Sequence, residues 1–91
     1  MQDLNLFIIF ARVIEAGSFS EAARRMDISR AAVSKAVAKL EKELSTRLLL
    51  RSTRHISLTE TGIAISEHAA RILEEAEHAE RVVNSLHSEP Q

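Results

Sequence analysis

The chain has 91 residues and a formal net charge of −1, and 45% of its residues are hydrophobic, which indicates one small globular domain. It contains no cysteine, so disulfides and cysteine-based zinc or redox sites are excluded. No apolar run approaches the length of a membrane span, and the first residues lack the basic start of a signal peptide, which predicts a cytoplasmic protein. Two glycines, one proline and three aromatic residues favour a mainly helical fold.

The small net charge conceals an uneven distribution along the chain. Residues 1–23 have a net charge of −2, residues 24–54 combine nine basic with three acidic side chains, and residues 55–91 have a net charge of −5. A positive middle segment is what contact with phosphate groups requires. For any such cluster taken alone, a solvated charged surface is the alternative.

The first predicted helix begins after Asp3, a favourable N-cap, and ends at Gly17, a favourable residue after a helix. Apolar residues cover nearly its whole circumference, so we expect it to be buried on several sides. One side can face the helices that follow. The other side needs a further helix or a second subunit.

Residues 19–38 are predicted to form a helix-turn-helix. Ser18 and Glu21 have the spacing of a capping box for a helix that ends near Met26. Asp27 occupies the turn, where left-handed backbone is needed, and Ser29 caps a second helix that extends to about residue 44. Apolar residues occur where two short helices must meet at a sharp angle, and these are Ala22, Met26, Ile28, Val33 and Ala36.

The second helix of this unit has two different faces. Its predicted inward stripe is apolar and consists of Val33, Ala36, Val37, Leu40 and Leu44. Its opposite face has small, hydroxyl and cationic side chains, namely Arg30, Ala31, Ser34, Lys35, Ala38 and Lys42. Such a face can enter a groove without steric conflict and donate hydrogen bonds there. Residues 29–44 are therefore predicted to be a recognition helix in the DNA major groove.

After this helix the apolar pattern changes to one of short strands. Residues 48–50 and 56–58 are predicted as two strands joined by a basic turn over residues 51–55, which together form a wing. Directly behind a helix-turn-helix, this wing is predicted to contact the DNA backbone or minor groove through Arg51, Ser52, Thr53 and Arg54. Ser18 and Ser20, at a helix N-terminus, and Lys39 are further candidates for backbone contact.

The last predicted helix is capped by Thr59 and extends to about residue 87. Its apolar residues step alternately by four and three positions, as in a coiled-coil seam. Since so small a domain cannot cover a seam of this length, we predict a dimerisation helix rather than an intramolecular brace. The predicted dimer interface consists of Ile65, Ala69, Ile72, Ala76, Ala79, Val83 and Leu86.

Several linked motifs resemble the N-terminal winged helix-turn-helix of LysR-type transcriptional regulators, over about residues 3–88. The matching segments are residues 17–23, 28–29, 32–34, 40–41, 44, 47–49 and 58–62. The resemblance implies a mainly α fold, with three helices and a two-stranded wing in residues 1–58, a linker and dimerisation helix in residues 59–88, and the start of a hinge in residues 89–91.

The resemblance also implies a function. Members of this family are bacterial regulators that bind interrupted palindromes in double-stranded DNA as dimers, are usually tetrameric when complete, and bind a small-molecule effector through a C-terminal domain. Because this chain ends where the hinge begins, we expect an excised DNA-binding domain that lacks the effector domain. It is expected to act in the cytoplasm, associated with the nucleoid.

The family's base-reading positions fall on Arg30, Ala31, Ser34 and Lys35. The usual residues there are similar to Gln, Pro, Ser and Arg, so three of the four positions differ. A guanidinium can bind guanine O6 and N7 bidentately whereas an amide prefers adenine, so the target sequence is expected to differ as well. A phosphate contact by Arg30 is the alternative.

No enzymatic site is predicted. The four histidines, at positions 55, 68, 78 and 87, lack the spacing of metal ligands, and neither a nucleophile–base pair nor a glycine-rich phosphate loop is present. We therefore expect no metal and no cofactor. The alternative function is a helical protein–protein interaction module that pairs through the seam in residues 65–86, with an incidental basic hairpin. DNA binding is distinguished from it by a steep loss of affinity with salt.

Overall fold

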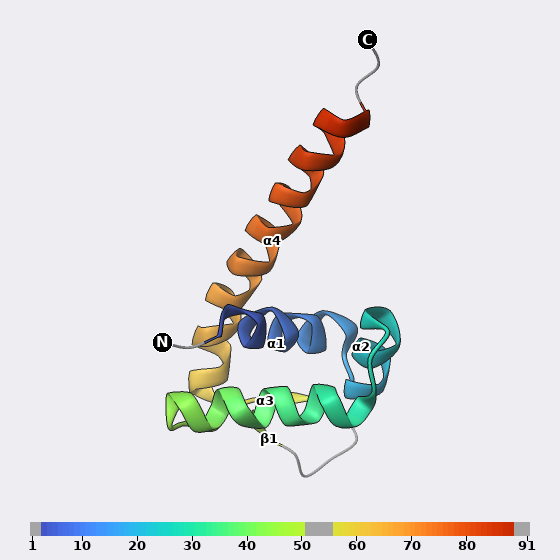
Figure 1. Ribbon diagram of the computed structural model, residues 1–91. Coiled ribbons are helices and arrows are strands. Elements are labelled where there is room, and N and C mark those ends of the chain that lie inside the picture. The colour runs from blue at the N-terminus through green and yellow to red at the C-terminus, as the bar shows by residue number, and fades with distance from the viewer. Residues whose placement is uncertain (1–2, 51–55, 89–91) are drawn as a thin grey trace.

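The computed structural model describes residues 3–50 and 56–88. Helices α1 and α3 lie one above the other, α2 joins them at one end of the body, and α4 extends away from the opposite end (Figure 1). Among the described residues, no helix is both long and apolar enough to cross a membrane. The elements in chain order are α1 (Leu4–Ala16), α2 (Phe19–Met26), α3 (Arg30–Leu44), β1 (Leu49–Leu50), β2 (Ser57–Leu58) and α4 (Glu60–Ser88).

Each of the four helices begins after the N-cap residue that the sequence predicts. The cap side chain accepts a hydrogen bond of 2.9–3.0 Å from a backbone N–H in the first turn, which satisfies a donor that has no partner within the helix. The four caps are Asp3 for α1, Ser18 for α2, Ser29 for α3 and Thr59 for α4.

A residue with left-handed backbone conformation follows each of the first three helices. Gly17 after α1 has a φ of 84°, Asp27 after α2 has a φ of 58°, and Ser45 after α3 has a φ of 56°. The predicted left-handed turn at Asp27 is therefore confirmed. Its backbone N–H donates to the end of α2, which closes the turn between α2 and α3.

The wing has the predicted antiparallel pairing, with Leu49 opposite Leu58 and Leu50 opposite Ser57. The described strands have two residues each. Leu48, predicted as the first residue of its strand, donates its N–H to Glu41 on α3 and accepts at its carbonyl oxygen from the N–H of Thr59. The turn predicted to contact DNA, residues 51–55, lies outside the described residues.

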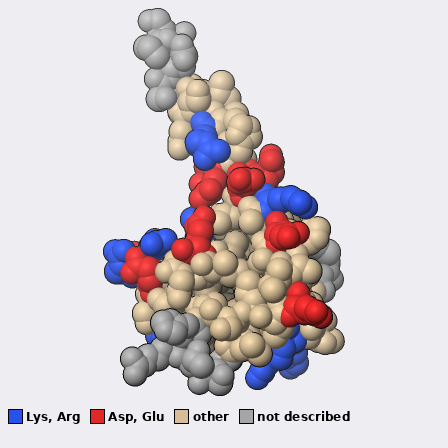
Figure 2. Space-filling view, turned by 180° about the vertical axis from the view of Figure 1, so that it is seen from behind, with Lys and Arg blue, Asp and Glu red and all other residues tan. Residues whose placement is uncertain are grey.

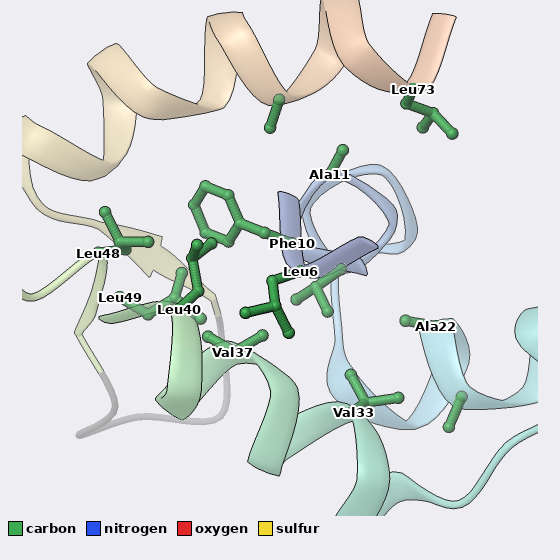
Figure 3. Packing of buried hydrophobic residues seen from close by; sticks show 13 residues of the cluster. Leu6, Phe10, Ala11, Ala22, Val33, Val37, Leu40, Leu48, Leu49 and Leu73 are labelled. Carbon is green, nitrogen blue, oxygen red and sulfur yellow. The ribbon is translucent and has the colours of Figure 1, made fainter. Parts of the chain in front are cut away.

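The core lies between α1, α3, the start of α4 and β1. Figure 3 shows the Phe10 ring pointing from α1 toward Leu40 and Leu48. These three side chains are 0% exposed. Helix α1 also packs against α4 of the same chain, so α4 is the further helix that the apolar circumference of α1 was expected to need. The prediction that Ile28 packs between the two helices is wrong: its side chain is 40% exposed, directly after the left-handed residue Asp27.

The first half of α4 packs on the body. Ala69 is fully buried and Leu73 nearly so, both within the core of their own chain. A half-buried ion pair of 3.2 Å between Arg12 and Glu77 joins α1 to α4 farther along. The body therefore covers only the first half of the predicted seam. The second half is uncovered by the described residues, since every side chain from residue 78 to residue 87 is exposed.

Candidate nucleic-acid interface

The exposed face of α3 gathers small and cationic side chains. The opposite face is fixed in the core, because Val33, Val37 and Leu40 are 0% exposed. This anchors the helix axis while its outer face stays accessible. The predicted exposed face is confirmed in full except for Ser34, which is half-buried, and its exposed members are Arg30, Ala31, Lys35, Ala38 and Lys42.

The four predicted base-reading residues lie together on the first two turns of α3. Arg30 and Ala31 are the first two residues of the helix, and Ser34 and Lys35 follow one turn later on the same side. All but Ser34 are exposed. Lys39, also exposed, extends this side by one more turn. Positions at the N-terminal end of a recognition helix are those that reach base edges.

The residues predicted to contact the DNA backbone differ in their exposure and in whether they already have a hydrogen-bond partner. The Ser18 hydroxyl accepts a hydrogen bond of 3.0 Å from the N–H of Glu21, so its oxygen is already used as the cap of α2. Ser20, the second residue of α2, is exposed. Arg51, Ser52, Thr53 and Arg54 lie outside the described residues, so these four remain predictions.

A compact ion cluster on α2 reduces the positive charge beside this face. The Glu21 carboxylate accepts hydrogen bonds from Arg24 and from Arg25, the latter at 3.0 Å. The hydrogen bonds from Arg24, followed by those from Arg25, lower the pKa of Glu21 from 4.5 to about 2. The spacing of three and four residues along a helix could have revealed this cluster in the sequence.

Arg30 has a contact that the sequence analysis missed. Its guanidinium carbon lies 5.7 Å from the centroid of the Phe19 ring. Phe19 is the first residue of α2 and Arg30 is the first residue of α3. No periodic spacing links two residues on different helices, so the sequence carried no signal for this pair.

A buried carboxylate joins α3 to the wing. Glu41, on α3, is only 8% exposed. Its Oε2 accepts hydrogen bonds from the backbone N–H groups of Leu48, at 2.8 Å, and Leu49, at 3.1 Å. The carbonyl oxygen of Glu41 also accepts from the N–H of Thr46 at 3.0 Å. The α3-to-β1 connection is therefore held by both the side chain and the backbone of one residue.

Acidic side chains gather where α4 leaves the body, with basic ones among them (Figure 2). Further basic side chains lie at the lower edge of the body, the side on which α3 lies in Figure 1. A groove of about 360 Å³ between α1 and α4 is rimmed by carboxylates, which repel phosphate. They belong to Glu15, Glu67, Glu74 and Glu77. Within the described ranges, no three potential metal ligands come together.

Known proteins are similar to this chain in sequence and in fold. Residues 4–63 match the family described as "Bacterial regulatory helix-turn-helix protein, lysR family". An HTH-type transcriptional regulator of Xanthomonas campestris pv. campestris is 47% identical over 88 residues, which are 97% of this chain and 26% of that protein. The regulator CrgA of Neisseria meningitidis is 43% identical over 83 residues, which are 91% of this chain and 28% of CrgA.

Solved structures agree with these matches. The DNA-binding domain of BenM, in complex with catB site 1 DNA, superposes with a TM-score of 0.81 at 26% identity, covering 99% of this chain and 100% of that one. CrgA superposes with a TM-score of 0.73 at 40% identity, covering all of this chain and 31% of CrgA. This chain spans about a quarter of the length of its curated relatives. It belongs to the LysR family of bacterial regulatory helix-turn-helix proteins and has the fold of that family's winged-helix DNA-binding domain.

Proposed function

We propose that this chain binds double-stranded DNA sequence-specifically, as a dimer on an interrupted palindrome. Helix α3 enters the major groove and the segment 51–55 contacts the backbone or minor groove. The observation that carries this proposal is the exposed cationic face on the first turns of α3, whose opposite face is fully buried. The likeness to a BenM domain in complex with DNA supports DNA binding by this chain.

The α3 face suits base reading because its members differ in reach. Ala31 is small enough to let the helix approach the base edges, while Arg30 and Lys35 extend cationic donors into the groove. Lys39 lies one turn farther from the N-terminal end, where a helix leaving the groove passes the phosphates. We assign base contacts to Arg30, Ala31, Ser34 and Lys35, and phosphate contact to Lys39.

Replacing Lys35 with alanine is expected to weaken binding to the selected duplex by about 1–3 kcal/mol, and to relax specificity at the base pair that it reads. The experiment selects bound duplexes from a random pool, sequences them, and then measures affinity for the selected and a scrambled duplex at several salt concentrations.

Lys39→Ala is the matched control, because it removes the same charge from the same helix. It is expected to weaken binding equally on both duplexes and to reduce the slope of log affinity against log salt by about 1 per protomer. Equal losses on both duplexes for Lys35→Ala would contradict base reading by Lys35. Salt-independent binding by the unmodified chain would contradict DNA binding itself.

We further propose that dimerisation uses the projecting half of α4 together with the half-buried residues beside its packed face. Val83 is 49% exposed and Leu86 is 72% exposed, on a helix face with no cover from the described part of the chain. Ile65, Ile72 and Ala76 are half-buried at the junction with the body and Ala79 is exposed. Ala69 is left out, because it is fully buried in its own core.

The substitution Val83→Glu tests this interface without disturbing the core, because the Val83 side chain is exposed within its own chain. A carboxylate in an apolar helix pair remains unpaired in the interface, so we expect the dimer dissociation constant to rise at least about 100-fold. Sedimentation velocity over a range of concentrations measures it. His78→Glu adds the same charge on the opposite side of the helix and is expected to leave the dimer intact. Equal dimer affinity in both variants would refute the interface.

Tetramer formation and effector binding, which the family resemblance implies for complete regulators, we assign to sequence outside these 91 residues. The relatives are about four times as long as their matched segments, which supports this division. A protein of this function would act where the DNA is, in association with the nucleoid.

A further inference from the structure

The three arginines at the helix-turn-helix have different partners. Arg24 and Arg25 both pair with the Glu21 carboxylate on α2. Within residues 3–50 and 56–88, Arg30 forms no ion pair, and its guanidinium instead lies over the Phe19 ring, 5.7 Å from the centroid. Among the described residues, no carboxylate therefore offsets the charge of Arg30 on the face assigned to DNA, and its side chain lies against an uncharged ring.

A contact of this kind restrains an arginine without consuming its hydrogen-bond donors. A cation over an aromatic face is attracted by the ring quadrupole within about 6 Å. The ring has no strong hydrogen-bond acceptor, so the five N–H groups of the planar guanidinium stay available as donors. An acidic partner would occupy two of these donors and repel DNA phosphates. The ring does neither.

The placement of Phe19 makes it a firm platform. Phe19 begins α2 directly after the Ser18 cap, and its half-buried ring packs against the hydrophobic core. Arg30 begins α3 directly after the Ser29 cap. The two caps fix the starts of both helices, so the backbone positions of the ring and the arginine are fixed relative to each other across the Asp27 turn.

We propose that Phe19 is a positioning residue for DNA recognition, which holds the Arg30 guanidinium edge-on to the groove and so sets the base that Arg30 reads. This rests on the proposed DNA binding. An arginine held in one orientation can donate to guanine O6 and N7 together. A freely rotating arginine binds phosphates as readily as bases, and it loses more conformational entropy when it binds a base. The sequence preference at one base pair would thus depend on a residue of α2 that does not touch that base pair.

The test compares Phe19→Leu, which keeps apolar bulk and removes the ring face, with Phe19→Tyr, which keeps the ring. Duplexes selected from a random pool define the preferred base pair, and affinity is then measured for that duplex and for one changed at the pair that loses preference in Arg30→Gln. Phe19→Leu is expected to reduce discrimination at that pair by about three- to fivefold. Phe19→Tyr is expected to retain it, and the salt dependence is expected to stay unchanged in both.

Two further measurements separate positioning from simple packing. In the Arg30→Gln background, Phe19→Leu is expected to have no further effect on discrimination, because the partner of the ring is already gone. In the free wild-type protein, NMR resonances of the Arg30 side chain are expected to shift upfield from the ring current and to lose this shift in Phe19→Leu. The NMR measurement needs no DNA, and its wild-type part does not depend on whether a variant folds.

The outcomes are distinct. Absence of the upfield shift in the wild type, or an equal loss of discrimination from Phe19→Leu with and without Arg30, would overturn the positioning role. Unchanged discrimination in a folded Phe19→Leu chain would overturn it as well. Selection of no sequence by the wild-type chain would instead overturn the proposed function.

Discussion

Replacing Gly62 with alanine is expected to destabilise the fold by about 3 kcal/mol or more, the upper range for overpacking a closely packed site. A Cβ atom at Gly62 would lie 2.1 Å from the carbonyl oxygen of Leu48 and 3.0 Å from its carbonyl carbon. Both are backbone atoms, so no side-chain rotation relieves the clash. The helix cannot easily move away, because the N–H of Thr59 donates to the same Leu48 oxygen at 3.0 Å and its hydroxyl donates to Arg47 at 2.6 Å.

The sign of the effect separates two accounts of α4. Considered as an isolated helix, α4 would gain about 1 kcal/mol from a change of glycine to alanine, since alanine has the higher helix propensity. Close packing against Leu48 predicts the opposite sign. The free energy of unfolding, measured in urea by far-UV circular dichroism, distinguishes them. A Gly62→Ala chain at least as stable as the wild type would contradict the close approach of α4 to Leu48.

The other glycine is the matched control. A Cβ at Gly17 would meet nothing within 4 Å, but the φ of 84° is left-handed. Gly17→Ala is therefore expected to cost about 1–2 kcal/mol, and Gly17→Asn less, because asparagine visits this backbone region more readily. At Gly62 the limit is space rather than backbone conformation, so Gly62→Asn is expected to be tolerated no better than Gly62→Ala.

Features that depend on neighbours in the sequence were predictable here. Capping by Ser18 or Ser29 involves a backbone N–H three residues later, so the residue type and its position suffice to locate the helix start. The left-handed turn at Asp27 is likewise a local preference. The exposed face of α3 follows from helical periodicity, which assigns Val33 and Val37 to the core and Lys35 to the surface.

The packing of α4 was not predictable from its strongest apolar pattern alone. The seam through Ile72 and Val83 is the most regular, yet the buried face is centred on Ala69, a member of that seam, and on Leu73, which lies beside it. A second set at residues 62, 66, 69 and 73 has the same steps of four and three, but it includes a glycine and a serine and so appears weaker. Its small residues are what allow the close approach to the body.

The contacts that tune the candidate site cross between elements, and this is why the sequence did not reveal them. Phe19 meets Arg30 only because the turn sets the angle between α2 and α3. Glu41 is held by N–H groups seven and eight residues later, a spacing that no helical pattern indicates, and it becomes buried because the chain folds back over it after α3. Tertiary contacts, rather than local preference, decide both cases.

Removing the Glu41 carboxylate is expected to have the second large effect. In Glu41→Leu, the N–H groups of Leu48 and Leu49 lose their acceptor, at about 1–3 kcal/mol for each buried donor left without one. Glu41→Gln keeps an acceptor oxygen and loses only the charge, so about 1 kcal/mol is expected, since charge-assisted hydrogen bonds are stronger than neutral ones. The predicted order of stability is wild type, then Glu41→Gln, then Glu41→Leu.

A buried charge often costs more than an apolar residue in its place, which would make Glu41→Leu stabilising. That reasoning fails here because two partners of Glu41 are the backbone N–H groups of Leu48 and Leu49, which no compensating substitution removes. Urea unfolding measures the order of stability, and hydrogen exchange at Leu48 and Leu49 locates the loss. Exchange at both should accelerate in Glu41→Leu. The exposed neighbour Glu43 provides the control Glu43→Gln, for which both amides should exchange as in the wild type. Equal exchange in all three chains would show that the carboxylate does not hold the strand to α3.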